Sequence, residues 1–174
     1  MAAPDFVLDA NVRSPTYYAA RTAAPCPHCV KATRLLAMAM PVTHQTLDVD
    51  APGAGEDTGD GLSSGTWQRA DAVAFLFYVQ QVSDGVQHRL HELSRHFRLA
   101  RSEASQNTYW ANHCEHCGTL LGDHELHCEP GGAFAPSSKV FAAKIELLHI
   151  NAPFQATASG YALEPEFLRH MRRS

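Results

Sequence analysis

Apolar residues follow one another without interruption in one short stretch and alternate with polar residues in others. Val73–Val79 (VAFLFYV) is rich in β-branched and aromatic side chains, which is typical of a central strand buried on both faces. In Lys144–Ile150, apolar positions recur every second residue, as they do in a strand with one buried face. Phe154–Leu163 is a further strand candidate, and Phe6–Ala24 predicts one or two edge strands.

Helical spacing is clearest between Val86 and Phe97. The apolar residues Val86, Leu90, Leu93 and Phe97 fall at intervals of four, three and four, so they form one stripe along a helix. We therefore predict one main amphipathic helix here, and a final short helix beginning at Pro165.

The outer face of that predicted helix is basic, because it carries Arg89, Arg95 and Arg98. Such a face is usually plain solvated surface. It is also the kind of surface that binds nucleic acid or an acidic protein, so both interpretations stay open.

Two segments are less defined by their pattern. Thr33–Met40 (TRLLAMAM) has the composition of a helix and a length that suits either a helix or a strand, and Pro41 ends it in both cases. The segment 48–65 is rich in Gly, Asp and Ser with no apolar period, which predicts a mobile acidic loop.

Length and composition fit one domain spanning residues 1–174, because 45% of the residues are hydrophobic and 18% are charged. The net charge of −4 argues against a surface built wholly for phosphate. The longest apolar run is strand-sized, and no signal peptide is recognisable, so we expect a cytoplasmic protein without a membrane span. Oligomeric state has no sequence signal.

The five cysteines indicate metal binding rather than disulfides. An odd number cannot all pair within the chain, and cytoplasmic cysteines usually stay reduced. Four of them form two C-x-x-C pairs, which predicts one structural zinc ion held by Cys26, Cys29, Cys114 and Cys117.

The residues that follow the two pairs differ. Gly118 can adopt positive φ after the second pair, whereas Val30 stands at the same place after the first. A β-branched residue tolerates positive φ poorly, so we expect the first turn to bend differently.

The second pair lies in the stretch Tyr109-Trp-Ala-Asn-His-Cys-Glu-His-Cys-Gly118, followed by Gly122-Asp123 and by Glu129-Pro-Gly-Gly-Ala-Phe134. This stretch resembles a pattern in uncharacterised bacterial zinc-ribbon-like proteins that also carry an earlier C-x-x-C. The resemblance covers about a third of the chain. It implies a shared metal site and brings no activity with it.

Two other sites compete with the four-cysteine site. Cys114 and Cys117 could instead bind a metal with His124 and His127, or with Cys128, although two residues between histidines is short for a zinc finger.

Cys26-Pro-His-Cys29 also matches the active-site tetrapeptide of bacterial thiol oxidases of the thioredoxin fold. In those proteins the first cysteine lies at a helix N-terminus, which lowers its pKa. Here the strand before it is poor, and the second pair would be left unexplained.

The sequence therefore predicts an α+β fold, in which a split zinc ribbon joins a small β-sheet to one main amphipathic helix. The predicted function is non-enzymatic: a small zinc-binding module or adaptor that recruits a protein or nucleic-acid partner. The alternative is a dithiol/disulfide oxidoreductase that uses Cys26 and Cys29.

Overall fold

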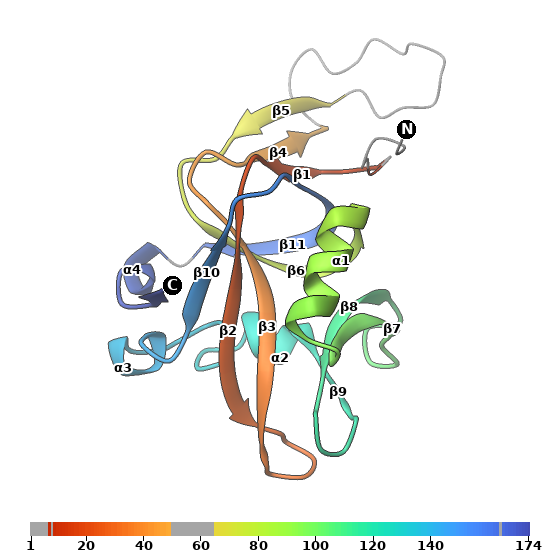
Figure 1. The fold of residues 1–174 in the computed structure, drawn as a ribbon, viewed down its shortest axis with the longest axis vertical. Helices are drawn as coiled ribbons and strands as arrows, with labels where there is room; N and C mark the ends of the chain where they lie inside the picture. The colour runs from red at the N-terminus through yellow and green to blue at the C-terminus, as the bar shows by residue number, and fades with distance from the viewer. Residues whose placement is uncertain (1–6, 8, 50–64, 164) are drawn as a thin grey trace.

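One large sheet organises the fold (Figure 1). The computed structural model describes residues 7, 9–49, 65–163 and 165–174. Within them, nine strands pair in the order β12-β10-β2-β3-β6-β11-β1-β4-β5, all antiparallel except β10 with β12. Their bounds are β1 Val12–Ser14, β2 Tyr17–Pro25, β3 Ala32–Met40, β4 Gln45–Asp48, β5 Thr66–Arg69, β6 Ala74–Val82, β10 Glu146–Ile150, β11 Phe154–Leu163 and β12 Arg172–Arg173.

A smaller sheet of three strands lies beside β6, in the order β7-β8-β9. Its strands are β7 Phe97–Arg101, β8 Thr108–His113 and β9 Leu120–Leu121. The described helices are α1 Asp84–Leu93, α2 Asp123–His127, α3 Lys139–Ala142 and α4 Pro165–Leu168. None of the helices in the described part of the chain has the length and apolar character needed to cross a bilayer.

The predicted α+β fold is wrong, because the described chain holds far more residues in strands than in helices, and its longest helix, α1, has only ten residues. The sheet is large rather than small. The reason is visible in β3, whose helix-favouring residues are buried on both faces of the sheet. Leu36 and Met38 point into one core cluster, and Leu35 and Ala37 point into the other. Burial on two faces outweighs the helix propensity of Leu, Ala and Met.

Several predicted strands are present with shifted bounds. The apolar run Val73–Val79 lies within β6 except for its first residue, β10 lies within Lys144–Ile150, and β11 has the predicted bounds. The segment Phe6–Ala24 was expected to form edge strands, and this is wrong. Both β1 and β2 have a neighbour on each side.

The main helix ends earlier than its apolar spacing predicts. Ser94 is extended (φ −159°, ψ 124°), and its hydroxyl accepts a hydrogen bond from the N–H of His96 at 3.2 Å. Serine side chains compete with the helical backbone in this way. Phe97 is still buried in the same core as Val86 and Leu90, but it reaches that core from strand β7.

The basic face Arg89, Arg95 and Arg98 is consequently not a single helix face. Arg89 lies on α1, Arg95 in the turn after it and Arg98 on β7. The predicted acidic loop falls mostly on residues 50–64, outside the described residues, and its flanks are the paired strands β4 and β5.

Candidate metal centre

Two turns of equal length carry the four predicted cysteines. The first joins β2 to β3 after the pair Pro25–Ala32, and the second joins β8 to β9 after the pair His113–Leu120. Six residues separate the members of each pair. The cysteines therefore occupy the first and fourth positions of both turns, where a hairpin can present two sulfur atoms to one point.

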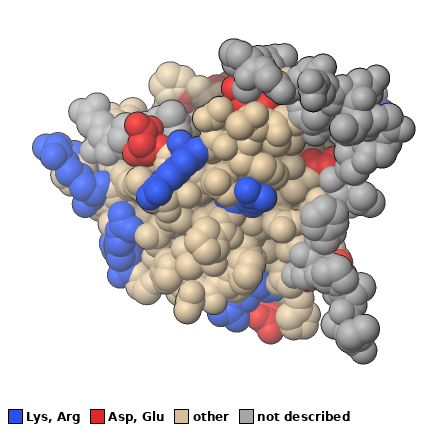
Figure 2. Space-filling model, turned by 90° about the horizontal axis from the view of Figure 1, so that it is seen from above, with Lys and Arg blue, Asp and Glu red and all other residues tan. Residues whose placement is uncertain are grey.

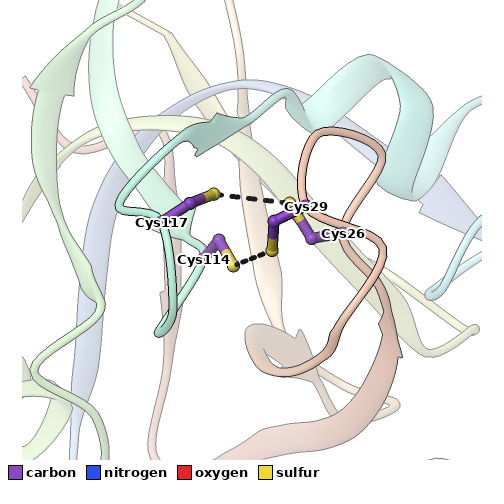
Figure 3. Close-up of side chains that lie close together, drawn as sticks. All are labelled: Cys26, Cys29, Cys114 and Cys117. Carbon is purple, nitrogen blue, oxygen red and sulfur yellow. Dashed lines mark hydrogen bonds between the residues drawn. The ribbon is translucent and has the colours of Figure 1, made fainter.

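The four sulfur atoms converge, each within 4.8 Å of the others (Figure 3). Sγ of Cys26 lies 3.7 Å from Sγ of Cys117, and Sγ of Cys29 lies 3.6 Å from Sγ of Cys114. Zinc–sulfur bonds of about 2.3 Å in a regular tetrahedron place the sulfur atoms about 3.8 Å apart. These two separations therefore fit tetrahedral coordination of one ion.

The two turns have the same hydrogen-bond pattern. In each turn the first cysteine N–H donates to the residue five positions on, at 2.9 Å, and its carbonyl accepts from the residue four positions on, also at 2.9 Å. His28 N–H and His116 N–H each lie 3.4 Å from the sulfur of the cysteine two positions earlier. Backbone donors aimed at sulfur favour the thiolate form.

The expectation that the first turn would bend differently is wrong. Val30 has φ 57° and Gly118 has φ 74°, so both adopt the left-handed conformation at the same position. The turn holds Val30 in this strained conformation, since the N–H of Val30 donates to the carbonyl of Cys26 at 2.9 Å, as the N–H of Gly118 does to Cys114.

Burial differs within each turn in the same sense. Cys26 and Cys114 are buried, and both belong to the core cluster that also contains Phe134. Cys29 is half-buried and Cys117 is exposed. The site therefore lies at the boundary between core and solvent, with one sulfur from each turn facing inward.

Hydrogen bonds stabilise the thiolate form of two of the four cysteines. The hydroxyl and the backbone N–H of Thr119 lower the pKa of the Cys117 thiol to about 5. The backbone N–H groups of Cys117 and His116 lower the pKa of Cys114.

Cys29 shows the opposing effect. The backbone N–H of Lys31 lowers its pKa, but desolvation and the three neighbouring sulfur atoms outweigh this and raise the pKa to about 11. Four adjacent thiolates are unfavourable without a cation among them.

Contacts outside the cysteines fasten the two turns together. Glu115 N–H donates to the hydroxyl of Thr33 at 3.0 Å, and its carboxylate pairs with Arg34 at 2.9 Å. Nε2 of His116 lies 2.9 Å from the carbonyl oxygen of Ala32. The second turn is therefore docked on β3 by its own side chains.

A buried asparagine joins the two sheets above the turns. The side chain of Asn112 accepts from the N–H of Leu36 and donates to its carbonyl, both at 2.9 Å. It occupies the edge of β3 that β6 does not cover, since β6 pairs only with Met38–Met40. Sequence reasoning noted Asn112 only within the stretch that resembles zinc-ribbon-like proteins and assigned it no role.

The competing ligand set is not assembled. His127 is buried between the rings of Phe77 and Phe134, and Nδ1 has no partner. His124 and Cys128 are exposed. Among the described residues, the four-cysteine cluster is the only group of His, Cys, Asp or Glu side chains arranged to hold a metal ion.

Asp123 is a second unusual group that sequence reasoning noted only as part of a resemblance. Its carboxylate accepts a hydrogen bond of 2.7 Å from the N–H of Tyr78, a residue with φ 50°. The other oxygen, Oδ1, is buried without a partner. Desolvation raises the pKa of Asp123 to about 7.

The chain has no match among family models, curated proteins or solved structures.

Proposed function

We propose that the chain is a non-enzymatic binding module whose fold is held by one structural zinc ion on Cys26, Cys29, Cys114 and Cys117. The observation that carries this proposal is the convergence of four sulfur atoms from two turns. Thiolates are soft ligands that select zinc over the hard cations of the cell, and an S4 set is typical of closed structural sites.

The ligand count supports a structural role. A catalytic zinc keeps one position open for water or substrate, whereas four protein thiolates leave none. The bound ion would join β2 and β3 of the large sheet to β8 and β9 of the small one. Because the thiolates meet only in the folded chain, the free energy of zinc binding adds to the free energy of folding.

Oxidoreductase chemistry at Cys26 and Cys29 has no support from the surrounding structure. The thioredoxin-like mechanism needs a helix that begins at the first cysteine and lowers its pKa. Here the segment after Cys29 is strand β3, and Cys26 is buried.

Elemental analysis of protein purified without added metal tests the proposal. We expect about one zinc per chain. Cys26→Ser and Cys114→Ser should each lower the zinc content to a similar extent, because each removes one buried ligand of the same ion. Cys128→Ser is the matched control and should keep the full zinc content.

Three results would contradict the proposal. A zinc content that responds only to changes at Cys114 and Cys117 would point to a local site in the second turn. Loss of zinc in Cys128→Ser would overturn the ligand assignment. An iron content of one per chain with visible thiolate-to-iron absorbance would replace zinc, since iron also accepts four tetrahedral thiolates.

A further inference from the structure

A groove of about 1070 Å³ lies next to the candidate metal centre. Its floor is the part of β2 and β3 nearest the turns, which includes Arg21 and Leu36. One wall is the end of α1 and the residues after it, and the other includes Lys144 and Arg172. The groove exists because α1 ends at Leu93 and leaves this part of the sheet face uncovered.

The lining has an excess of positive charge. Five cationic side chains line it against three carboxylates, whereas the whole chain has a net charge of −4. The cations are Arg21, Arg34, Arg95, Lys144 and Arg172, and the carboxylates are Glu92, Glu115 and Glu146. By contrast, the end of the molecule that carries β4 and β5 shows both Lys and Arg and Asp and Glu side chains among neutral residues (Figure 2).

The three carboxylates already have partners within the chain. Glu146 pairs with Arg21 and Glu115 pairs with Arg34, each at 2.9 Å. Glu92 pairs at 2.9 Å with Arg89, which does not line the groove. The lining cations without a salt bridge among the described residues are therefore Arg95, Lys144 and Arg172, of which Arg172 also lies close enough to Glu146 to lower the pKa of that carboxyl.

Arg95 and Lys144 follow two helices, α1 and α3, that flank β2 and β3 (Figure 1). Both side chains are exposed. No salt bridge to Arg95 is found among the described residues, and the Lys144 ammonium lies 4.8 Å from the centre of the Phe141 ring.

The rim beside Lys144 is apolar. Val140 and Phe141, on α3, are 71% and 53% exposed. Exposed apolar residues beside a charged groove are typical of a surface that contacts another protein.

We propose that this groove binds an acidic peptide segment of a partner protein, an inference that rests on the binding role proposed above. Carboxylates of the peptide would pair with Arg95, Lys144 and Arg172, and its apolar side chains would contact Val140 and Phe141. The glutamates of the lining offer acceptors for peptide N–H groups.

Nucleic acid fits the lining less well. A phosphodiester chain carries one negative charge on every nucleotide, whereas the lining offers only three cations without a salt bridge to another described residue, next to an apolar rim. Single strands also need exposed aromatic faces for base stacking. The only aromatic rings among the described lining residues are the imidazoles of His91 and His96, and Lys144 lies over the nearby Phe141 ring.

Selection from a phage-displayed library of random dodecapeptides tests the proposal. The bait is the full chain with its metal, and binding of the selected peptides is then measured by fluorescence anisotropy. The groove variant combines Arg95→Glu with Lys144→Glu. The control variant combines Arg69→Glu on β5 with Arg101→Glu on β7, which changes the net charge by the same amount away from the groove.

We expect the wild type and the control to select peptides rich in Asp and Glu. The groove variant should weaken their binding by about tenfold or more, because charge reversal places like charges together. A second variant, Arg95→Gln with Lys144→Gln, removes both charges without reversing them and should show a smaller loss of peptide binding. It replaces the first variant in the test if that one fails to fold.

Selection of peptides without acidic excess, or equal binding by the groove variant, would overturn the proposal. Tighter binding of a labelled oligothymidylate that the groove variant loses would assign the groove to nucleic acid instead. Zinc content is measured on every preparation. If a variant keeps its zinc but loses peptide binding, the loss is due to the groove and not to the metal site. If the purified wild type contains no zinc but still binds the peptides, only the proposed metal site is refuted.

Discussion

Val30 and Gly118 occupy equivalent positions in the two metal-binding turns and share the left-handed backbone conformation, with φ 57° and 74°. Only one of them is the residue that this conformation favours. The valine side chain is 80% exposed, so it adds little packing to the fold.

Placing glycine at position 30 and valine at position 118 should change the free energy of unfolding in opposite directions. Val30→Gly should stabilise the protein by roughly 0.5–1 kcal/mol, because relief of the left-handed strain exceeds the added freedom of glycine in the unfolded chain. Gly118→Val should destabilise it by about 1–2 kcal/mol. A Cβ at Gly118 meets no atom within 4 Å, so this effect is conformational rather than steric. Urea unfolding with zinc present measures both, and a Val30→Gly protein that is clearly less stable would contradict the account.

Asn112→Ala should destabilise the protein by about 2–4 kcal/mol. The change leaves the N–H and the carbonyl of Leu36 buried without partners, and each unsatisfied group costs about 1–3 kcal/mol. Asn107→Ala is the matched control, because Asn107 is exposed and should change stability little. Similar urea midpoints for the two variants would show that Asn112 does not couple the sheets.

Asp123 should make stability fall as pH rises. Its pKa is about 7 in the folded protein against an ordinary value of 3.8, so the folded state holds the proton more tightly across that interval. Stability should therefore decrease by up to about 1.4 kcal/mol per pH unit between those values and become constant above about pH 7.

Asp123→Asn keeps an acceptor for the Tyr78 N–H and removes the titration. The stability difference between wild type and variant should follow the pH dependence above, while zinc loss in acid affects both proteins alike. His127 acts in the opposite direction. Burial lowers its pKa from 6.5 to about 3, so its contribution is lost as pH falls below 6.5. A wild-type-minus-variant difference that does not change with pH would contradict the Asp123 assignment.

The number of reactive thiols should depend on the metal. Cys128 is exposed and outside the cluster, so it should be the one cysteine alkylated at neutral pH in the loaded protein. Its pKa is raised by desolvation and by the nearby Asp123 carboxylate, so this reaction should be slow. A chelator should expose all five cysteines and loosen the fold. Mass spectrometry counts the modified thiols, and rapid modification of Cys26 alone without chelator would favour the oxidoreductase.

The sequence predicted the centre better than the architecture around it. Cysteine spacing alone identified the four residues that the structure brings together. Two C-x-x-C motifs in one chain are typical of a metal site with four thiolate ligands. The strands with continuous or alternating apolar residues, β6 and β10, were also predictable, and β11 has the bounds that the sequence predicted.

The rest depended on tertiary context. Val86, Leu90, Leu93 and Phe97 keep helical spacing, yet Ser94 ends the helix and Phe97 enters the core from a strand. Strands β1, β4, β5 and β12 have two to four residues, too few for a period to be recognised. The groove is assembled from segments as distant as β2 and β12, so no local pattern encodes it.

The separation of the two turns along the chain has a consequence for the order of events during synthesis. Cys29 and Cys114 are 85 positions apart, and closing a loop of that length costs about 4 kcal/mol of chain entropy. With the proposed zinc site, a nascent chain that ends before Cys114 offers only two thiolates and holds the ion weakly. Strand β10, which completes the pairing of β2, emerges later still. The proposed zinc ion can therefore bind tightly only after β2, β3 and β6 have left the ribosome, whereas β10 and the longest strand, β11, follow later.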